Sequence, residues 1–196
     1  MRILGTVGLP GSGKGELAAV ARDEGIPVVT MGDVIRQACR DRGLDPAENH
    51  GRVARALREE RGPTAIAEAS LPHINALLDD DETETIVVDG LRSMAEVNVF
   101  TDAFGESFSI VSVEAPFDLR AERLGERGRD SSDNDLEKLR ARDERERGFG
   151  MDDVMAAADY QIDNTETLAS FRTQARAVLT GETNTEPAPP ETNESQ

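Results

Sequence analysis

The sequence predicts an α/β fold in which helices cover both faces of a five-stranded, mostly parallel sheet. Five short apolar runs predict the strands: residues 2–7, 27–30, 85–88, 108–113 and 160–163. At least one stretch with helical spacing follows each run, and strands that alternate with helices form parallel sheets buried on both faces. The 196 residues suffice for one such domain with a substantial core.

The remaining elements follow in chain order. Helices are predicted over 14–24, 32–42, 47–60, 63–78 and 94–104, from Pro116, and over 136–147 and 168–179. An acidic turn, DDDETE at 79–84, precedes the third strand. From Gly181 the chain is rich in Pro, Glu, Thr and Asn, so we expect one domain over 1–180 and a disordered acidic tail over 181–196.

The charge balance is strongly acidic. The chain has 39 Asp and Glu against 22 Lys and Arg, for a net charge of −17, and its only lysines are Lys14 and Lys138. This balance indicates either an acidic interaction surface or adaptation to a salty cytosol. The second interpretation is favoured because the acidic residues are spread over the whole chain. A net charge of this sign makes nucleic acid an unlikely partner.

The pattern of apolar residues and cysteine predicts a cytoplasmic protein. A single cysteine, Cys39, excludes an internal disulfide and fits a reducing compartment. The N-terminus lacks the pattern of a signal peptide, and no stretch of about 18 apolar residues is present to span a membrane.

Residues 8–15, GLPGSGKG, form a glycine-rich loop between the first strand and the first helix. Glycines at 8, 11 and 13 allow backbone N–H groups to turn toward one phosphate at the positive end of the helix. Lys14 then places its ammonium on the outer phosphates. The predicted ATP-binding residues are Gly8, Leu9, Pro10, Gly11, Ser12, Gly13, Lys14 and Gly15.

The third strand ends in a carboxylate, Asp89, followed by Gly90. At a strand end beside a phosphate loop, an aspartate orients Mg²⁺ or the waters bound to it. A helix cap or a turn is the alternative role for such a residue. Together with the phosphate loop, the position favours Asp89 as the metal residue.

The loop resembles that of adenylate kinases and related nucleotide kinases, which have Gly-Lys-Gly-Thr where this chain has Gly13-Lys14-Gly15-Glu16. The resemblance implies a three-layer fold of the P-loop NTPase type. Glu16 departs from the family pattern, because a hydroxyl is missing and a carboxylate this close would repel phosphate. We expect Glu16 to point to solvent or to an arginine.

Two further segments resemble the acceptor side of adenylate kinases. Residues 30–36, TMGDVIR, are similar to Thr-Gly-Asp-x-x-Arg with Met31 inserted, and residues 89–92, DGLR, to Asp-Gly-Phe-Pro-Arg with one residue deleted. The resemblance implies that Arg36 and Arg92 bind the acceptor phosphate and that Asp33 belongs to the same substrate-binding site, beneath a helical cap of about 32–78. A planar guanidinium binds phosphate oxygens bidentately, although each arginine alone could be a solvated surface residue.

Residues 122–129, ERLGERGR, resemble the segment before the mobile lid of these kinases and a similar segment of dephospho-coenzyme A kinases. The resemblance implies that Arg123 lies near the donor base and Arg127 near its outer phosphates, where both neutralise charge during transfer. It also implies a short lid at about 128–139, closed by Arg140 or Arg142. The alternative is a helix with i,i+4 ion pairs.

Residues 158–164, ADYQIDN, are similar to a stretch of dephospho-coenzyme A kinases that lies beside the donor adenine. Taken together, the motifs most resemble a group of archaeal, adenylate-kinase-like P-loop proteins. No motif pattern includes His50 or His73, for which surface or capping roles are predicted.

Two functions are compatible with these patterns. One is a kinase that uses Mg²⁺ and moves the γ-phosphoryl group of ATP to a nucleoside monophosphate or another small phosphate-bearing acceptor. The other is an ATP-binding switch or ATPase that acts on a protein or ribonucleoprotein partner and needs no acceptor pocket. A guanine-reading Asn-Lys-x-Asp motif is absent, which counts against a regulatory GTPase.

Overall fold

The computed structural model describes residues 1–80, 83–127 and 136–182, with only the backbone of Arg127. Within these ranges one parallel sheet has the strand order β2-β3-β1-β4-β5. Its strands are β1 (Arg2–Val7), β2 (Val28–Thr30), β3 (Thr85–Asp89), β4 (Phe108–Glu114) and β5 (Tyr160–Asp163). The predicted α/β fold and its strands are confirmed. Most of the predicted lid, 128–135, and the tail from 183 lie outside the described residues.

The helices match the predicted ranges to within one or two residues at each end. They are α1 (Lys14–Asp23), α2 (Met31–Asp41), α3 (Pro46–Arg61), α4 (Ala65–Leu78), α5 (Met94–Phe104), α6 (Phe117–Arg127), α7 (Leu136–Arg147) and α9 (Leu168–Thr180). The sequence analysis missed α8 (Met151–Ala156) and a 3₁₀ turn, Gly105–Ser107. Both are shorter than two helical turns, so neither has room for an apolar repeat.

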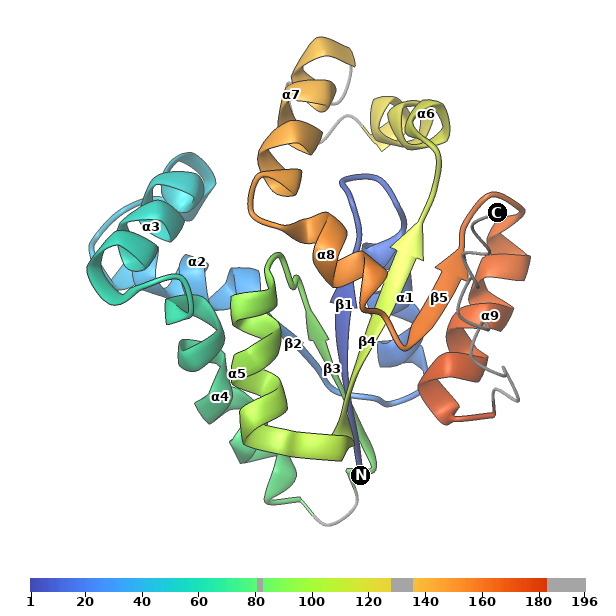
Figure 1. Ribbon diagram of the computed structural model, residues 1–196, viewed down its shortest axis with the longest axis horizontal. Helices are drawn as coiled ribbons and strands as arrows, with labels where there is room; N and C mark the ends of the chain where they lie inside the picture. Colours follow the sequence, from blue (N-terminus) through green and yellow to red (C-terminus); the bar gives the residue numbers. More distant parts are fainter. Residues whose placement is uncertain (81–82, 128–135, 183–196) are drawn as a thin grey trace, which may run out of the picture.

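Two apolar layers sandwich the sheet. Along β1, Ile3 and Val7 pack into one layer while Leu4 packs into the other, as the two-residue period of a strand requires. Helices α1 and α9 cover the Leu4 face, and α2, α4, α5 and α8 cover the Ile3 face (Figure 1). The sheet is therefore buried on both sides, which explains why its strands are apolar throughout.

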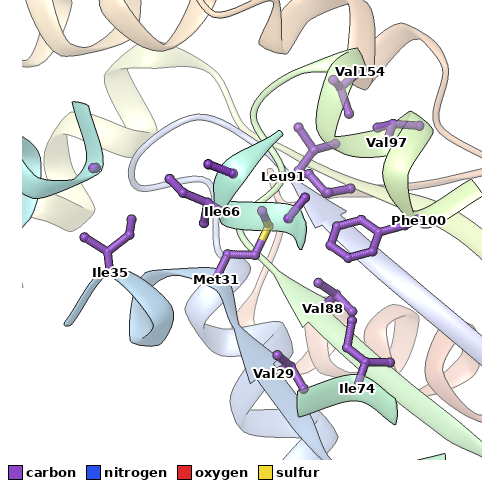
Figure 2. Packing of buried hydrophobic residues seen from close by; sticks show 14 of the residues in the cluster. Val29, Met31, Ile35, Ile66, Ile74, Val88, Leu91, Val97, Phe100 and Val154 are labelled. Carbon is purple, nitrogen blue, oxygen red and sulfur yellow. The ribbon is translucent and has the colours of Figure 1, made fainter. Parts of the chain in front are cut away.

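The larger layer reaches from the sheet into the helices that carry the acceptor-side motifs. Met31, at the start of α2, is 2% exposed and packs with Ile66 of α4 and Leu91 after β3 (Figure 2). Met31 is the residue inserted relative to the adenylate-kinase pattern. The Met31 side chain is accommodated in the core. The extra residue therefore does not move the polar residues that follow it away from the strand ends.

The carboxyl ends of the strands form the edge at which α3, α6 and α7 gather (Figure 1). At the opposite edge, the Arg2 guanidinium donates to the carbonyl oxygens of Val178 and Leu179 at the end of α9, at 2.9 and 3.1 Å. Within the described ranges, no helix is both long enough and apolar enough to cross a membrane. In parallel α/β sheets ligands bind beyond the carboxyl ends of the strands, so this edge is where a site is expected.

Candidate phosphate-binding site

The loop between β1 and α1 adopts a conformation that depends on glycine. Gly8, Gly11 and Gly13 have φ values of +155°, +82° and +119°. A Cβ atom at Gly13 would collide with the Asn164 amide, whose nitrogen donates to the Ser12 carbonyl at 2.7 Å. The loop ends at the N-terminus of α1, where first-turn N–H groups have no partner in the helix. The loop thus has the geometry of an anion cradle.

Lys14 begins α1 and turns back over the loop. Its ammonium donates to the carbonyl oxygens of Gly8 and Leu9, the latter at 3.5 Å. Burial lowers the pKa of Lys14 to about 8, and the positive charge of Arg92 adds to this shift while Asp89 opposes it. The charged ammonium is therefore poorly solvated and lies near other cations, and a bound phosphate would stabilise its charge.

Asp89 ends β3 beside the phosphate loop. The register pairs it with Thr6 of β1, whose wholly buried hydroxyl donates to Asp89 Oδ1 at 2.7 Å. In the described part of the chain, no cluster of three or more His, Cys, Asp or Glu side chains could hold a metal by itself. A single oriented carboxylate fits Mg²⁺, which usually takes one or two protein carboxylates and completes its shell with phosphates and water.

A cavity of about 250 Å³ brings together predicted residues from the phosphate loop, the third strand end, the acceptor side and the lid. Lys14 and Asp89 face it from the sheet edge, and guanidinium groups surround it from four elements. The predicted residues that line it are Gly8, Pro10, Lys14, Arg36, Asp89, Arg92 and Arg142. The cavity wall carries five cationic side chains, Lys14 and four arginines, against three carboxylates, Asp89, Glu96 and Glu146, in a protein whose net charge is −17. An anionic ligand is what such a cavity attracts.

The two predicted acceptor arginines are held by carboxylates. Arg36 Nε donates to Asp33 Oδ1 at 2.7 Å, and the Asp33 side chain is 65% exposed and does not line the cavity. Asp33 therefore orients Arg36 from outside. Arg92 Nη1 lies 3.3 Å from Glu146 Oε2 of α7. The Arg92 backbone N–H donates to Glu96 Oε2 at 2.8 Å, which fixes the turn after β3.

The cavity also contains residues that the sequence analysis missed. Arg58 of α3 donates to Glu96 Oε1 at 3.3 Å, and Glu96 is 1% exposed, so burial raises the pKa of its carboxyl. His50, for which a surface or capping role was predicted, is half-buried and lines the cavity. Burial lowers the pKa of His50; a hydrogen bond with the Gly32 backbone opposes this shift, and the positive charge of Arg36 adds to it. These contacts join α3 to α5 across 38 residues, and no local motif could reveal them.

A second, larger cavity of about 660 Å³ opens between α3 and α7. It shares His50, Arg58, Arg92, Arg142 and Glu146 with the first cavity, so the two are neighbours. Its additional walls include apolar surface from Ala54, Pro63 and Phe149. The Arg58 guanidinium lies 5.4 Å from the centre of the Phe149 ring. The pair of cavities suits a ligand with a charged end and a less polar body.

Two of the arginines predicted for the donor side and the lid, Arg123 and Arg140, line neither cavity. Arg123 donates through Nη2 to the Asn164 carbonyl at 2.9 Å, next to the phosphate loop. Arg140 stacks on the Phe117 ring at 4.2 Å and does not line the Lys14 cavity, whereas Arg142 does. The side chain of Arg127 lies outside the described residues. Of the two lid arginines considered, the structure thus brings Arg142 to the cavity.

Arg120, which the sequence analysis also missed, ties the phosphate loop to α7. Its guanidinium is almost wholly buried, donates to the Pro10 carbonyl at 2.9 Å, and forms a double hydrogen bond with Asp143 at 3.0 and 2.5 Å. Glu16 points to an arginine, as expected, since its carboxylate accepts from Arg172 at 2.7 Å.

Buried polar atoms without a hydrogen bond cluster at the site. Among the described side chains these atoms are Ser12 Oγ, Arg123 Nη1 and Glu146 Oε2. Native proteins pair nearly all such atoms, so each one that remains unpaired requires an explanation. All three lie at the phosphate loop or at the cavities beside it, and a bound ligand would explain them together.

The glycine loop, Lys14, the aspartate on the neighbouring strand and the parallel sheet define a P-loop protein of the kinase-like type. A family model for the AAA domain matches residues 7–140. A UPF0200 protein of Halobacterium salinarum is 56% identical over 183 residues, covering 93% of this chain and 95% of the relative. The chain therefore belongs to the UPF0200 family.

Two solved structures share the fold. TT1252 from Thermus thermophilus superimposes with a TM-score of 0.62 at 20% identity, covering 93% of this chain and 98% of that one. The shikimate kinase of Acinetobacter baumannii, determined with shikimate, gives a TM-score of 0.51 at 15% identity and covers 93% of each chain. At these identities the likeness establishes the kinase-like fold and nothing about the substrate.

Proposed function

We propose that this protein is a kinase that transfers the γ-phosphoryl group of ATP to a small phosphate-bearing acceptor. The observation that carries the proposal is the cavity in which Lys14 and Asp89 face four arginines, Arg36, Arg58, Arg92 and Arg142. An ATP-binding protein without a small acceptor needs the loop and Asp89 but has no use for this enclosure of guanidinium groups.

On the donor side, the amides of residues 8–15 and Lys14 would bind the phosphates of ATP. Asp89 would hold Mg²⁺ together with those phosphates, and the metal would supply positive charge to the β- and γ-oxygens. Arg123 lies on α6 beside the loop, where its unpaired Nη1 could serve a ligand atom, and we propose the same charge-neutralising role for Arg127.

On the acceptor side, Arg36 and Arg92 would bind the acceptor's phosphate, and Arg58 adds a third guanidinium. Each arginine already has one carboxylate partner, so its direction is fixed before the acceptor arrives. A nucleoside monophosphate or a similar metabolite fits this charge pattern and the apolar wall at Phe149. Phosphoryl transfer depends mostly on positioning and charge stabilisation, which such a preset arrangement supplies.

The experiment that tests the proposal uses purified protein and Mg-ATP in molar potassium chloride. A panel of nucleoside monophosphates and dephospho-coenzyme A is offered, with Lys14→Ala as the control. Product that is absent with Lys14→Ala would support the kinase. Binding of a monophosphate should be saturable and lost in Arg36→Ala. ATP binding that is indifferent to every acceptor would refute the proposal and favour a switch or ATPase with a macromolecular partner.

We further propose that the protein works in a saline cytosol. The support is the even spread of acidic residues and the 56% identical relative from Halobacterium salinarum. A surface with a net charge of −17 repels itself at low ionic strength, and salt screens that repulsion within a few ångströms at molar concentration. Unfolding temperatures should therefore rise steeply with potassium chloride. A flat dependence would refute the proposal.

A further inference from the structure

Glu146 stands out among the acidic residues of the site. It lies on α7, is 6% exposed, and lines both the Lys14 cavity and the larger cavity beside it. Its Oε2 atom is buried and accepts no hydrogen bond. Arg92 is 3.3 Å away and compensates the charge without making a hydrogen bond to that atom.

Other carboxylates on the cavity wall already have donors. Both oxygens of Glu96 are engaged, by the Arg92 N–H and by Arg58. Asp89 accepts from Thr6 and is the carboxylate suited to the metal. Glu146 therefore contributes a buried acceptor to a cavity whose other charged groups are mostly cationic. An acceptor atom held in this way is complementary to a ligand that brings a hydrogen-bond donor.

A phosphate oxygen is not such a ligand. The second pKa of a phosphomonoester is about 6, so at neutral pH the oxygens of a monophosphate carry no proton to donate, and a buried carboxylate beside them would repel them. A hydroxyl group has the opposite properties. It donates a hydrogen bond to the carboxylate, and it must lose its proton to become phosphorylated.

We infer that Glu146 is a catalytic residue that accepts the proton of an acceptor hydroxyl, so that the acceptor is a hydroxyl-bearing phosphate ester phosphorylated on that hydroxyl. The inference rests on the proposed kinase function and specifies its acceptor atom. Arg36 and Arg58 bind the ester's phosphate, while the hydroxyl lies between Glu146 and the phosphate loop.

In the transfer step, the acceptor oxygen forms a bond to the γ-phosphorus of ATP. The bond from that phosphorus to the β–γ bridging oxygen breaks, and its electron pair leaves with ADP. The hydroxyl proton passes to Glu146 Oε2 and then to solvent. The products are ADP, a proton and a second phosphomonoester on the acceptor. Transfer to a monophosphate oxygen would instead create a phosphoanhydride.

The position of the new phosphate tests the inference. Mg-ATP is incubated with dephospho-coenzyme A, with ribonucleoside 5′-monophosphates and with their 2′,3′-dideoxy counterparts, and the products are read by ³¹P NMR. The inference expects a new monoester resonance and no turnover of the dideoxy compounds. Coupled phosphoanhydride doublets, or turnover of a dideoxy acceptor, would overturn it.

Variants of Glu146 give a second readout that needs no identified acceptor, because water can replace the hydroxyl in ATP hydrolysis. General-base catalysis contributes roughly 10²–10⁴-fold, so E146Q should lower the kcat of ATP hydrolysis by about 100-fold with ATP affinity unchanged. Where an acceptor is used, any rise in its KM through Arg92 should be small beside the loss in kcat. E146D should retain more activity than E146Q. Glu144→Gln, an exposed position on the same helix that lines neither cavity, is the matched control and should behave like the wild type.

Different outcomes refute the role of Glu146 and the proposed kinase function. An E146Q variant with wild-type kcat, or one that only raises the acceptor KM by loosening Arg92, would overturn the role of Glu146 and leave the kinase intact. A wild-type protein that neither transfers nor hydrolyses faster than Lys14→Ala would overturn the proposed function, and the inference with it.

Discussion

Replacing Asp143 by asparagine tests whether the buried pair between Arg120 and Asp143 stabilises the molecule. The side chains of Arg120 and Asp143 are 3% and 10% exposed, and the guanidinium also donates to the carbonyls of Ala115 and Pro10. In Asp143→Asn the side chain keeps its shape and one acceptor but loses its charge. The guanidinium is then left as a buried cation without a counter-ion.

The magnitude follows from burial. Removing one partner of a buried ion pair costs about 3–5 kcal/mol, and the acceptor that asparagine keeps places this change near the lower end, about 3 kcal/mol. For a chain of this size, each kcal/mol lowers the unfolding temperature by about 2–4 °C, so a decrease of about 6–12 °C is expected. Calorimetry or circular dichroism in molar potassium chloride would measure it.

A matched control lies nearby. Arg147 and Asp152 are 3.7 Å apart with side chains 53% and 58% exposed, so Asp152→Asn should cost only about 0–1 kcal/mol. The difference between the two variants should persist at high salt, because buried pairs are screened much less than exposed ones. Equal unfolding temperatures for Asp143→Asn and Asp152→Asn would refute the reasoning that burial makes Arg120 depend on its partner.

Three further results are expected. Bound phosphate favours the charged form of Lys14, whose pKa is about 8, so ADP affinity measured by calorimetry should be constant below that pH and weaken above it. A Lys14→Met variant that keeps this pH dependence would show that Lys14 is not the group that titrates. Gly13→Ala should abolish ATP binding and destabilise the fold by about 1–3 kcal/mol, because φ is +119° and the new Cβ meets Asn164; unchanged ATP affinity would exclude a strained loop. Glu16→Thr gives up an exposed pair with Arg172, about 0–1 kcal/mol, and should tighten Mg-ATP binding by removing a carboxylate; weaker binding would show that Glu16 assists the site.

The fold was predictable because its signals are local. Apolar runs alternate with helical spacing, and the glycine loop marks the turn after β1. The prediction missed α8, because a helix of six residues is too short for the apolar helical spacing to repeat. Met31 was noted only as an insertion, and the structure explains it as a core residue whose packing depends on Ile66 and Leu91.

Most of the site residues that could be predicted lie in motifs at or near a strand end; Arg142 of α7, predicted from the lid resemblance, is the exception. Asp89 ends a strand of a parallel sheet, Lys14 and Arg92 come in the segments after a strand, and the topology alone places such residues at one edge. Arg58 and Glu146 reach the same cavity from helices that tertiary packing brings there. Charged residues such as these are equally common on a solvated helix surface, so no pattern in the sequence distinguishes a residue of the cavity wall from a surface residue.

The contact between Arg2 and the end of α9 has a practical consequence for handling this protein. It holds the first strand and the last helix together at the edge of the sheet opposite the phosphate loop. Tags or surface linkers attached near Met1 or after Gly181 would leave the cavities open to ligands. The same proximity allows the start of β1 and the end of α9 to be joined by a short linker in place of the residues after 182, so that a circularly permuted chain could be opened at an exposed loop.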